Sequence, residues 1–233
     1  VAVSGGPDSL ALTALINFYS YENKCKVYYV LVDHNLRKYS SREASSVKKL
    51  LKRFRINLHI LKNKKKIEKN IQSEARKIRY DLITKFCKKK RIPIVLTAHN
   101  FEDQVETFFI RLSRGSGLDG LSSMKQISKI GYNLFLVRPL LEYKKLQLVK
   151  ISKTIFGKFY IDPSNENTKY LRTRIRNLKR TLEISGIKYD RIFQSIKNLA
   201  SSRDTLDAYF KATYKDLVTK KKNEISIKIK SFS

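Results

Sequence analysis

Cysteine is scarce in this chain of 233 residues, which contains only Cys25 and Cys87. The two lie far apart and form neither a CxxC pair nor a spacing typical of metal ligands, so a zinc cluster is not expected. Nor do they provide a disulfide framework, and a reducing cytoplasm fits this composition best. The simplest interpretation is that both are small, half-buried side chains.

Acidic residues are the second shortage. The sequence has 20 Asp and Glu against 50 Lys and Arg, a formal net charge of +30. Such a surplus attracts polyanions and speeds encounter with them, so nucleic acid is the leading partner. A solvated basic face without a specific ligand explains the charge about equally well.

Long apolar runs are also missing. No stretch approaches the roughly 20 residues that span a bilayer, and no basic amphipathic helix carries Trp or Phe anchors for a membrane surface. We therefore expect no membrane partner. The first residues do not have the pattern of a signal peptide; Val1–Val3 predicts the end of a buried strand.

The sequence does contain an alternation of strand and helix patterns from its first residue to about Arg114. This alternation predicts an α/β fold with a doubly wound parallel sheet, Rossmann-like, which binds ligands at the carboxyl ends of its strands. The loops after Val3, Val32 and Ala98 should then meet in one crevice. We expect strands over 1–3, 26–33, 56–61, 94–98 and 135–139, and helices over 9–19, 40–55, 73–90, 101–114, 142–156, 170–185 and 189–220.

Two domains are predicted: an α/β domain over residues 1–185 and a smaller helical C-terminal region over 186–233. A turn is expected at Asp162–Asn165. We expect this C-terminal region, which stops at Ser233, to be either a short form or a truncated one.

The first functional candidate is the loop Ser4–Ser9, between the first strand and a helix. Gly5 and Gly6 allow a sharp turn and bring backbone N–H groups close to an anion. Pro7 suits the first turn of a helix, and a helix N-terminus favours phosphate. No Gly-Lys-Ser/Thr closes the loop, so it is not a Walker A loop, and an ordinary strand-to-helix turn is the alternative.

The side chains of this loop add a requirement for a cation. Ser4 and Ser9 offer hydroxyl donors. Asp8 would repel bound phosphates unless a cation lay between them, which implies Mg²⁺ bound by Asp8.

A second cluster leaves a predicted strand at Thr97–Thr107. Asp103 and Glu106 are three residues apart and share a helix face, where they are able to bind a metal ion or an ammonium group. His99 is a candidate to contact phosphate or to carry a proton. The alternative is that these acids only complement the helix dipole.

A third cluster contains Arg76 and Arg79, three residues apart on a predicted helix. The guanidinium fork bonds two phosphate oxygens at once, so the pair suits a phosphate group. A solvated basic face is the alternative.

Together these clusters resemble the tRNA(Ile)-lysidine synthetase family, within the N-type ATP pyrophosphatase (PP-loop) superfamily. The resemblance covers residues 1 to about 180, with the motifs in the family's order. The matching segments are SGGPDS at Ser4–Ser9, VDHNLR at Val32–Arg37, ARKIRY at Ala75–Tyr80, TAHNFEDQVET at Thr97–Thr107, RGSGLDGLSSM at Arg114–Met124, RPLL at Arg138–Leu141, DPSN at Asp162–Asn165 and RTRIRN at Arg172–Asn177.

The resemblance implies a ligase that uses ATP and Mg²⁺. ATP adenylylates the C2 oxygen of the wobble cytidine in tRNA(Ile) with a CAU anticodon, and free L-lysine then displaces AMP to give lysidine. A homodimer is compatible with this assignment.

The resemblance also implies roles for individual residues. Arg79, with Arg76, stabilises charge at the α-phosphate. The residues implied for catalysis are Asp8, Arg79, Asp103 and Glu106. Those implied for ATP binding are Ser4, Gly5, Gly6, Pro7, Asp8, Ser9, Asp33, His34 and His99. The residues implied for metal binding are Asp8 and Asp103, and those implied for lysine binding are Asp103 and Glu106. The residues implied for tRNA binding are Arg76, Arg114, Arg172, Arg174 and Arg176.

Two other functions stay open. Another PP-loop enzyme, such as a tRNA 2-thiocytidine synthetase, shares the phosphate loop but usually needs paired cysteines, and Cys25 and Cys87 are not so arranged. An inactive basic RNA-binding module is the second alternative. The intact Asp8, Asp103 and Glu106 argue against it.

Overall fold

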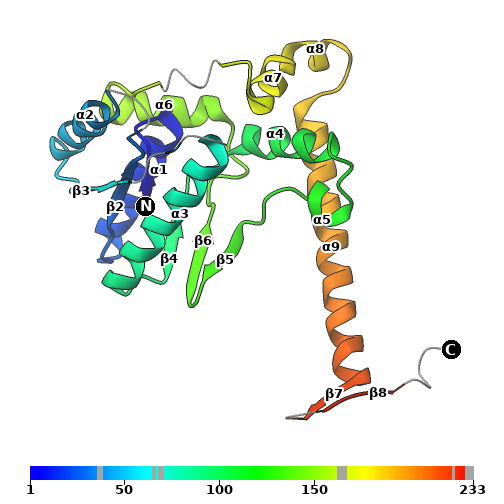
Figure 1. The fold of residues 1–233 in the computed structure, drawn as a ribbon. Helices are drawn as coiled ribbons and strands as arrows, with labels where there is room; N and C mark the ends of the chain where they lie inside the picture. Colours follow the sequence, from blue (N-terminus) through cyan, green and yellow to red (C-terminus); the bar gives the residue numbers. More distant parts are fainter. Residues whose placement is uncertain (36–38, 65–66, 68–70, 162–166, 222–223, 229–233) are drawn as a thin grey trace. The chain divides into compact units, whose positions relative to one another are not determined.

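A computed structural model describes residues 1–35, 39–64, 67, 71–161, 167–221 and 224–228 (Figure 1). The chain divides into two compact units. The sheet unit comprises Val1–Gln104 and Lys125–Arg174, and the helical unit comprises Val105–Met124 and Ile175–Ser233. These units do not coincide with the predicted division at residue 185, because residues 105–124 associate with the C-terminal helices.

The sheet unit alternates strands and helices, which confirms the predicted α/β class (Figure 1). Helix α4 begins in this unit and α7 ends outside it. The elements are β1 Ala2–Val3, α1 Pro7–Glu22, β2 Tyr29–Asp33, α2 Ser40–Lys52, β3 Leu58–Lys62, α3 Ile71–Lys90, β4 Ile94–Leu96, α4 Phe101–Leu112, β5 Ile127–Gly131, β6 Leu134–Val137, α6 Lys145–Phe156 and α7 Leu171–Asn177.

The strands of the sheet unit form two three-stranded sheets, each a hydrogen-bonded ladder. One has the order β1-β2-β3 and is parallel throughout, with Tyr29 opposite Leu58. In the other, β4-β6-β5, β6 runs parallel to β4 and antiparallel to β5. Strand β5 was not predicted, because its exposed and half-buried residues lack the continuous apolar run of a central strand.

Strand β2 divides the core by the two-residue period of a β-strand. Tyr29 and Leu31 pack in the cluster that includes residues of α2 and α6. Val30 and Val32 point to the other face, in the cluster with Ile83 of α3 and residues of β4 and β6. This second cluster joins the two ladders around one apolar core.

One predicted helix is divided in the structure, whereas another ends where the sequence predicts. The single helix expected over 170–185 is wrong: it is divided into α7 and α8 (Lys179–Ile184). The break comes at Leu178, whose N–H bonds to the Ile175 carbonyl three residues back instead of four. In contrast, Gly157 ends α6 with a φ of 71°. The turn predicted at 162–165 lies outside the described residues.

The helical unit contains α5 (Leu118–Leu121), α8 and the long α9 (Tyr189–Leu217). Helix α9 ends three residues before the predicted end at 220, and the residues beyond it form the hairpin of β7 (Val218–Lys221) and β8 (Glu224–Ile227). No helix of the described chain is both long and apolar enough to cross a bilayer.

Candidate active site

The loop Ser4–Ser9 is stabilised by one hydroxyl group. Ser9 Oγ accepts hydrogen bonds from the backbone N–H groups of Ser4 and Gly5, both at 3.1 Å, and donates one to the Gly6 carbonyl at 3.0 Å. Gly6 is the N-cap of α1, and Pro7 follows in its first turn. The predicted strand–loop–helix geometry is therefore present. It presents a helix N-terminus at the carboxyl end of β1, the arrangement that favours phosphate binding.

Gly5 is required by its surroundings. Its φ is +86°, a region that other residues rarely adopt. A Cβ at this position would lie 2.6 Å from Cγ2 of Val47 in α2. The Gly5 carbonyl also accepts a hydrogen bond from the N–H of Tyr160 at 2.9 Å. The loop is thus packed between α2 and the segment after α6.

Asp8 carries the carboxylate of the loop Ser4–Ser9. Its Oδ1 is buried and has no hydrogen-bond partner among the described residues. Burial raises the pKa of Asp8 to about 6; Lys145 and a hydrogen bond from Asn100 lower it, while Asp103 and Glu102 raise it. Two further acids thus lie near an Asp8 oxygen atom that has no hydrogen-bond partner among the described residues. Such a site fits a hard cation with oxygen ligands.

Asp103 has a local structural role as well. Its Oδ2 accepts from the N–H of Asn100 at 3.1 Å, and its own N–H donates to Asn100 Oδ1 at 3.0 Å. This reciprocal pair caps the start of α4. Glu102 also accepts a hydrogen bond, at 2.8 Å, from the N–H of Lys145, the first residue of α6. Glu102 thereby joins the starts of α4 and α6 near Asp8.

Glu106 belongs to the helical unit and is almost completely buried, with 1% of its surface exposed. Its carboxylate is bound at two points by Arg176, from Nε at 2.7 Å and Nη2 at 3.1 Å. We expected Glu106 to bind lysine and Arg176 to bind tRNA. The structure pairs these two side chains with each other.

His99 lies at the carboxyl end of β4, where its Nδ1 is 3.0 Å from Thr97 Oγ1. Burial lowers the pKa of His99 to about 4; Asp103 opposes this shift, and Arg138, Arg172 and Arg76 add to it. The imidazole is therefore neutral near pH 7. A neutral ring suits hydrogen bonding to a nucleotide better than electrostatic binding of its phosphates.

Asp33 ends β2, and His34 follows it. Asp33 accepts hydrogen bonds from Ser41 Oγ at 2.6 Å and from the Asn35 N–H at 3.0 Å. Burial opposes its ionisation, but these hydrogen bonds outweigh burial and lower its pKa. The carboxylate is therefore occupied in shaping the loop between β2 and α2.

His34 and Arg79 interact directly, since Arg79 Nε donates to His34 Nε2 at 3.4 Å. Burial and the nearby guanidinium lower the pKa of His34 to about 4, against a smaller opposing effect of Asp33. Its Nδ1 is buried without a partner among the described residues. The structure thus brings together a neutral imidazole and a cation that we had predicted separately.

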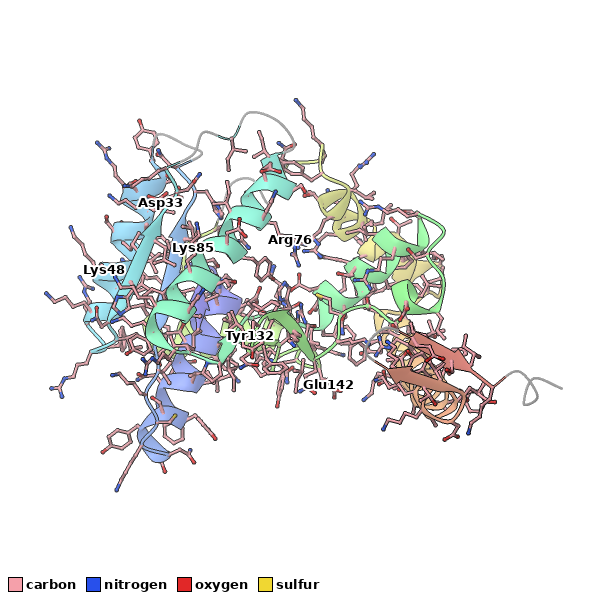
Figure 2. The ribbon with its side chains drawn as sticks, turned by 60° about the horizontal axis from the view of Figure 1, so that its bottom comes forward. Asp33, Lys48, Arg76, Lys85, Tyr132 and Glu142 are labelled. Carbon is pink, nitrogen blue, oxygen red and sulfur yellow. The ribbon has the colours of Figure 1, made fainter. Side chains whose placement is uncertain are left out.

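The arginines predicted to contact tRNA differ in exposure. Arg76, labelled in Figure 2, is exposed on α3 with its guanidinium 5.2 Å from the centre of the Tyr80 ring. Arg174 and Arg114 are also exposed, and Arg172 is half-buried. These four lie in two different units.

Several structural residues were missed by the sequence analysis. Asn63 is buried; its N–H donates to the Asp33 carbonyl at 2.8 Å and its side chain to the His34 carbonyl at 3.2 Å. Lys145, beside Asp8, was also missed. Neither stands in a recognisable local motif, so only the packing of distant segments reveals them.

Two further arginines hold the glycine-rich segment of the helical unit. Arg111 Nη1 donates to the carbonyls of Gly120 at 2.7 Å and Ser123 at 2.9 Å. Arg203 of α9 is buried and donates to Ser122 Oγ. No local sequence pattern around Arg203 marks this contact.

No group of three or more His, Cys, Asp or Glu side chains able to hold a metal ion occurs in the described ranges. A Mg²⁺ ion needs only one or two protein carboxylates, because it retains water and binds substrate phosphates. The buried, unpartnered Oδ1 of Asp8 therefore fits the first such ligand, with Asp103 nearby.

The cysteines do not form a pair of reactive thiols. Cys25 is exposed after α1, and Cys87 is buried in α3. Burial raises the pKa of the Cys87 thiol, which disfavours the thiolate.

Comparison with known proteins agrees with the geometry of the phosphate loop. The chain is 37% identical over 222 residues to a tRNA(Ile)-lysidine synthase of Wolbachia pipientis wMel, covering 94% of this chain and 51% of that protein. It is 42% identical over 188 residues to the synthase of Orientia tsutsugamushi (strain Boryong), covering 79% of this chain and 42% of that protein. The chain thus spans about half the length of these relatives.

The fold is also similar to a solved structure, a U34-tRNA thiolase from Methanococcus maripaludis with its 4Fe-4S cluster. The TM-score is 0.68 with 18% sequence identity, over 86% of this chain and 70% of that one. At this identity the likeness supports the fold alone. The family model of an ATP-binding PP-loop domain matches residues 1–181, so the chain belongs to the PP-loop family.

Proposed function

We propose that this chain carries out the ATP-dependent ligation of lysine to C2 of the wobble cytidine of CAU-anticodon tRNA(Ile), through an adenylylated tRNA. The observation that carries the proposal is the buried oxygen of Asp8, which lies within the phosphate loop and near Asp103 and has no hydrogen-bond partner among the described residues. The relatives named lysidine synthases support the choice of substrate.

In this proposal the loop Ser4–Ser9 binds the pyrophosphate end of ATP through the backbone N–H groups in the first turn of α1. Asp8 and Asp103 would hold Mg²⁺, which when bound neutralises charge on the phosphates. Arg79, oriented by His34, stabilises the charge that develops at the α-phosphate. Asp33 shapes the adjoining loop, and His99 accepts or donates a hydrogen bond as a neutral ring.

The lysine ammonium is assigned to Asp103 and Glu106, which are three residues apart on α4. Both carboxylates already accept hydrogen bonds within the chain. A carboxylate has about four lone-pair sites and so accepts from more than one donor at a time. The internal partners would hold both carboxylates in place for the amine.

The tRNA is assigned to the basic surface. With a net charge of +30, the chain attracts RNA over long distances. Arg76, Arg114, Arg172 and Arg174 are the proposed contacts, and Arg176 would reach tRNA only from its pair with Glu106. We place the reaction in the cytoplasm, and a homodimer is compatible with it.

The decisive experiment supplies ATP, Mg²⁺, labelled lysine and an unmodified CAU-anticodon tRNA. We expect label in the tRNA together with release of AMP and pyrophosphate. Asp8→Asn should abolish pyrophosphate release with little change in tRNA binding. Asp81→Asn, at an exposed position on α3, is the matched control and should retain turnover. Full activity of Asp8→Asn would refute the metal role.

The thiolation alternative is tested in the same assay with a sulfur donor. Since Cys25 and Cys87 are not paired for sulfur transfer, a Cys25→Ser/Cys87→Ser double variant should still transfer lysine. If the wild type transfers sulfur and incorporates no lysine, and the double variant loses the sulfur transfer, thiolation would replace lysine ligation as the proposed function.

A further inference from the structure

The edge of the sheet unit opposite the phosphate loop has an unusual concentration of positive charge. The helices α1, α2 and α3 each follow a parallel strand and run back, so their C-terminal ends meet at the amino ends of the strands. The segments 22–28, 48–57 and 85–92 at this edge contain twelve Lys and Arg and one acid, Glu22. We call these three segments the distal basic edge.

This concentration exceeds the bias of the chain as a whole, which has 50 basic and 20 acidic residues. All twelve basic side chains are exposed. Lys and Arg in the last turn of a helix complement its dipole, but this accounts only for residues such as Lys52 and Lys88. Lys26, Arg55 and Arg91 lie in the connections beyond the helices, where the dipole does not require them.

An aromatic ring lies among these cations. Lys26 Nζ is 5.4 Å and Lys90 Nζ 5.9 Å from the centre of the Tyr28 ring. The rings of His59 and Phe86 lie 6.0 and 5.9 Å from that of Tyr28, so the ring is supported by packing. A supported aromatic ring with ammonium groups beside it is typical of surfaces that bind single-stranded nucleic acid.

A polar hollow of about 290 Å³ opens beside this ring. Its walls come from α1, from the two connections that lead into β2 and β3, and from β3 itself, and include Asn17, Ser20, Tyr28, Arg55, Asn57 and His59. Amide, hydroxyl and guanidinium groups are able to bond both to phosphate oxygens and to the edge of an unstacked base. The hollow thus adds hydrogen-bonding groups to the charge.

We propose that the distal basic edge is a second RNA-binding surface, which binds the sugar–phosphate backbone outside the active site. Helix α3 has 20 residues and so extends about 30 Å. It has Arg76 and Arg79 near its start and Lys88–Lys90 at its end, while Lys85, labelled in Figure 2, lies between them. One bound RNA would follow this helix from the active site to the opposite edge.

The test compares two triple variants with the same change in net charge. The distal variant is Lys26→Gln/Arg55→Gln/Lys90→Gln. The control is Lys129→Gln/Lys150→Gln/Lys153→Gln, at exposed positions of β5 and α6. If the three distal cations contact phosphates, the distal variant should bind tRNA about 10- to 100-fold more weakly at 0.15 M salt. Its slope of log affinity against log salt should be shallower by about 2–3. The control should match the wild type.

Equal affinities and salt slopes for the two variants would overturn the proposal. Vesicles of phosphatidylserine and phosphatidylcholine form a second arm: vesicle binding lost only in the distal variant, with tRNA binding unchanged, would assign the edge to a membrane surface instead. Unchanged ATP binding in the distal variant verifies its fold. The proposed surface rests on the proposed function only in that tRNA is the probe. If tRNA binds but lysine is not ligated, the proposed function is refuted and the proposed RNA-binding surface still stands.

Discussion

The Arg176 guanidinium holds the Glu106 carboxylate in a two-point ion pair, although the residues lie 70 positions apart in sequence. The pair is asymmetric: the side chain of Arg176 is 35% exposed and that of Glu106 only 2%. Loss of the arginine would leave a buried charge without its partner, whereas loss of the carboxylate leaves an arginine that can reach water. The two residues therefore should not respond equally to substitution.

We predict that Arg176→Gln lowers the free energy of unfolding by about 3 kcal/mol and that Glu106→Gln lowers it less. In a double-mutant cycle the coupling should be about 1–3 kcal/mol. Urea denaturation followed by circular dichroism measures both. Arg180→Gln, exposed on α8, is the control and should be nearly neutral. Additive effects of the two substitutions would show that the pair contributes no coupling energy.

Asp8 should make the protein without nucleotide less stable as pH rises. The folded-state pKa is about 6 against an ordinary value of 3.8. The folded state therefore binds more protons between these values, and stability falls as pH rises from about 4 to 6. At pH 7.5, Asp8→Asn should be more stable than the wild type by up to about 3 kcal/mol, and near pH 4 the difference should vanish. Thermal melts across pH test this; a constant difference would contradict it.

The same group should control the pH dependence of the reaction. Protonation of Asp8 below about pH 6 removes the carboxylate proposed to hold Mg²⁺, so pyrophosphate release should decline there. His34 and His99 have pKa values near 4 and should not titrate between pH 5.5 and 8. NMR of the ring protons checks the histidines. An acidic limb that persists in His99→Gln would agree with Asp8 as its source, and loss of the limb would assign it to His99.

The two histidines also affect stability at low pH. Because their folded-state pKa values lie below the ordinary 6.5, the unfolded state binds their protons more strongly. Their contribution is complete above pH 6.5 and is lost as pH falls toward 4. His34→Gln should therefore flatten the acid side of the stability curve, as measured by urea denaturation. An unchanged curve would contradict the low pKa of His34.

Gly5→Ala should damage both stability and nucleotide binding. The added Cβ meets Val47 at 2.6 Å while φ is +86°, and together these effects should cost about 2–5 kcal/mol. Gly157→Ala has a similar φ of +71° but nothing within 4 Å, so it should cost only about 1–2 kcal/mol. Calorimetry of ATP binding should show a loss for Gly5→Ala alone. Equal effects of the two variants would show that the contact with Val47 is unimportant.

The sequence by itself determined the local features of this protein. Alternating apolar patterns located β1, β2, β3, β4 and β6 and most helices, because strand and helix periods depend on neighbouring residues. The glycines and proline of Ser4–Ser9 were likewise readable, because backbone conformation at Gly5 is a local property. The order of motifs led to the PP-loop family, which the family match confirms.

Only the tertiary structure decided which side chains of the candidate site interact. Two contacts join segments far apart in the chain: that of His34 with Arg79 and that of Glu106 with Arg176. The burial of Asp8 Oδ1 without a hydrogen-bond partner among the described residues likewise depends on distant segments. The break between α7 and α8 and the edge strand β5 also escaped prediction, because no local signal marks them. Burial and partners set the charge state of a group, and both depend on long-range packing that residue spacing does not encode.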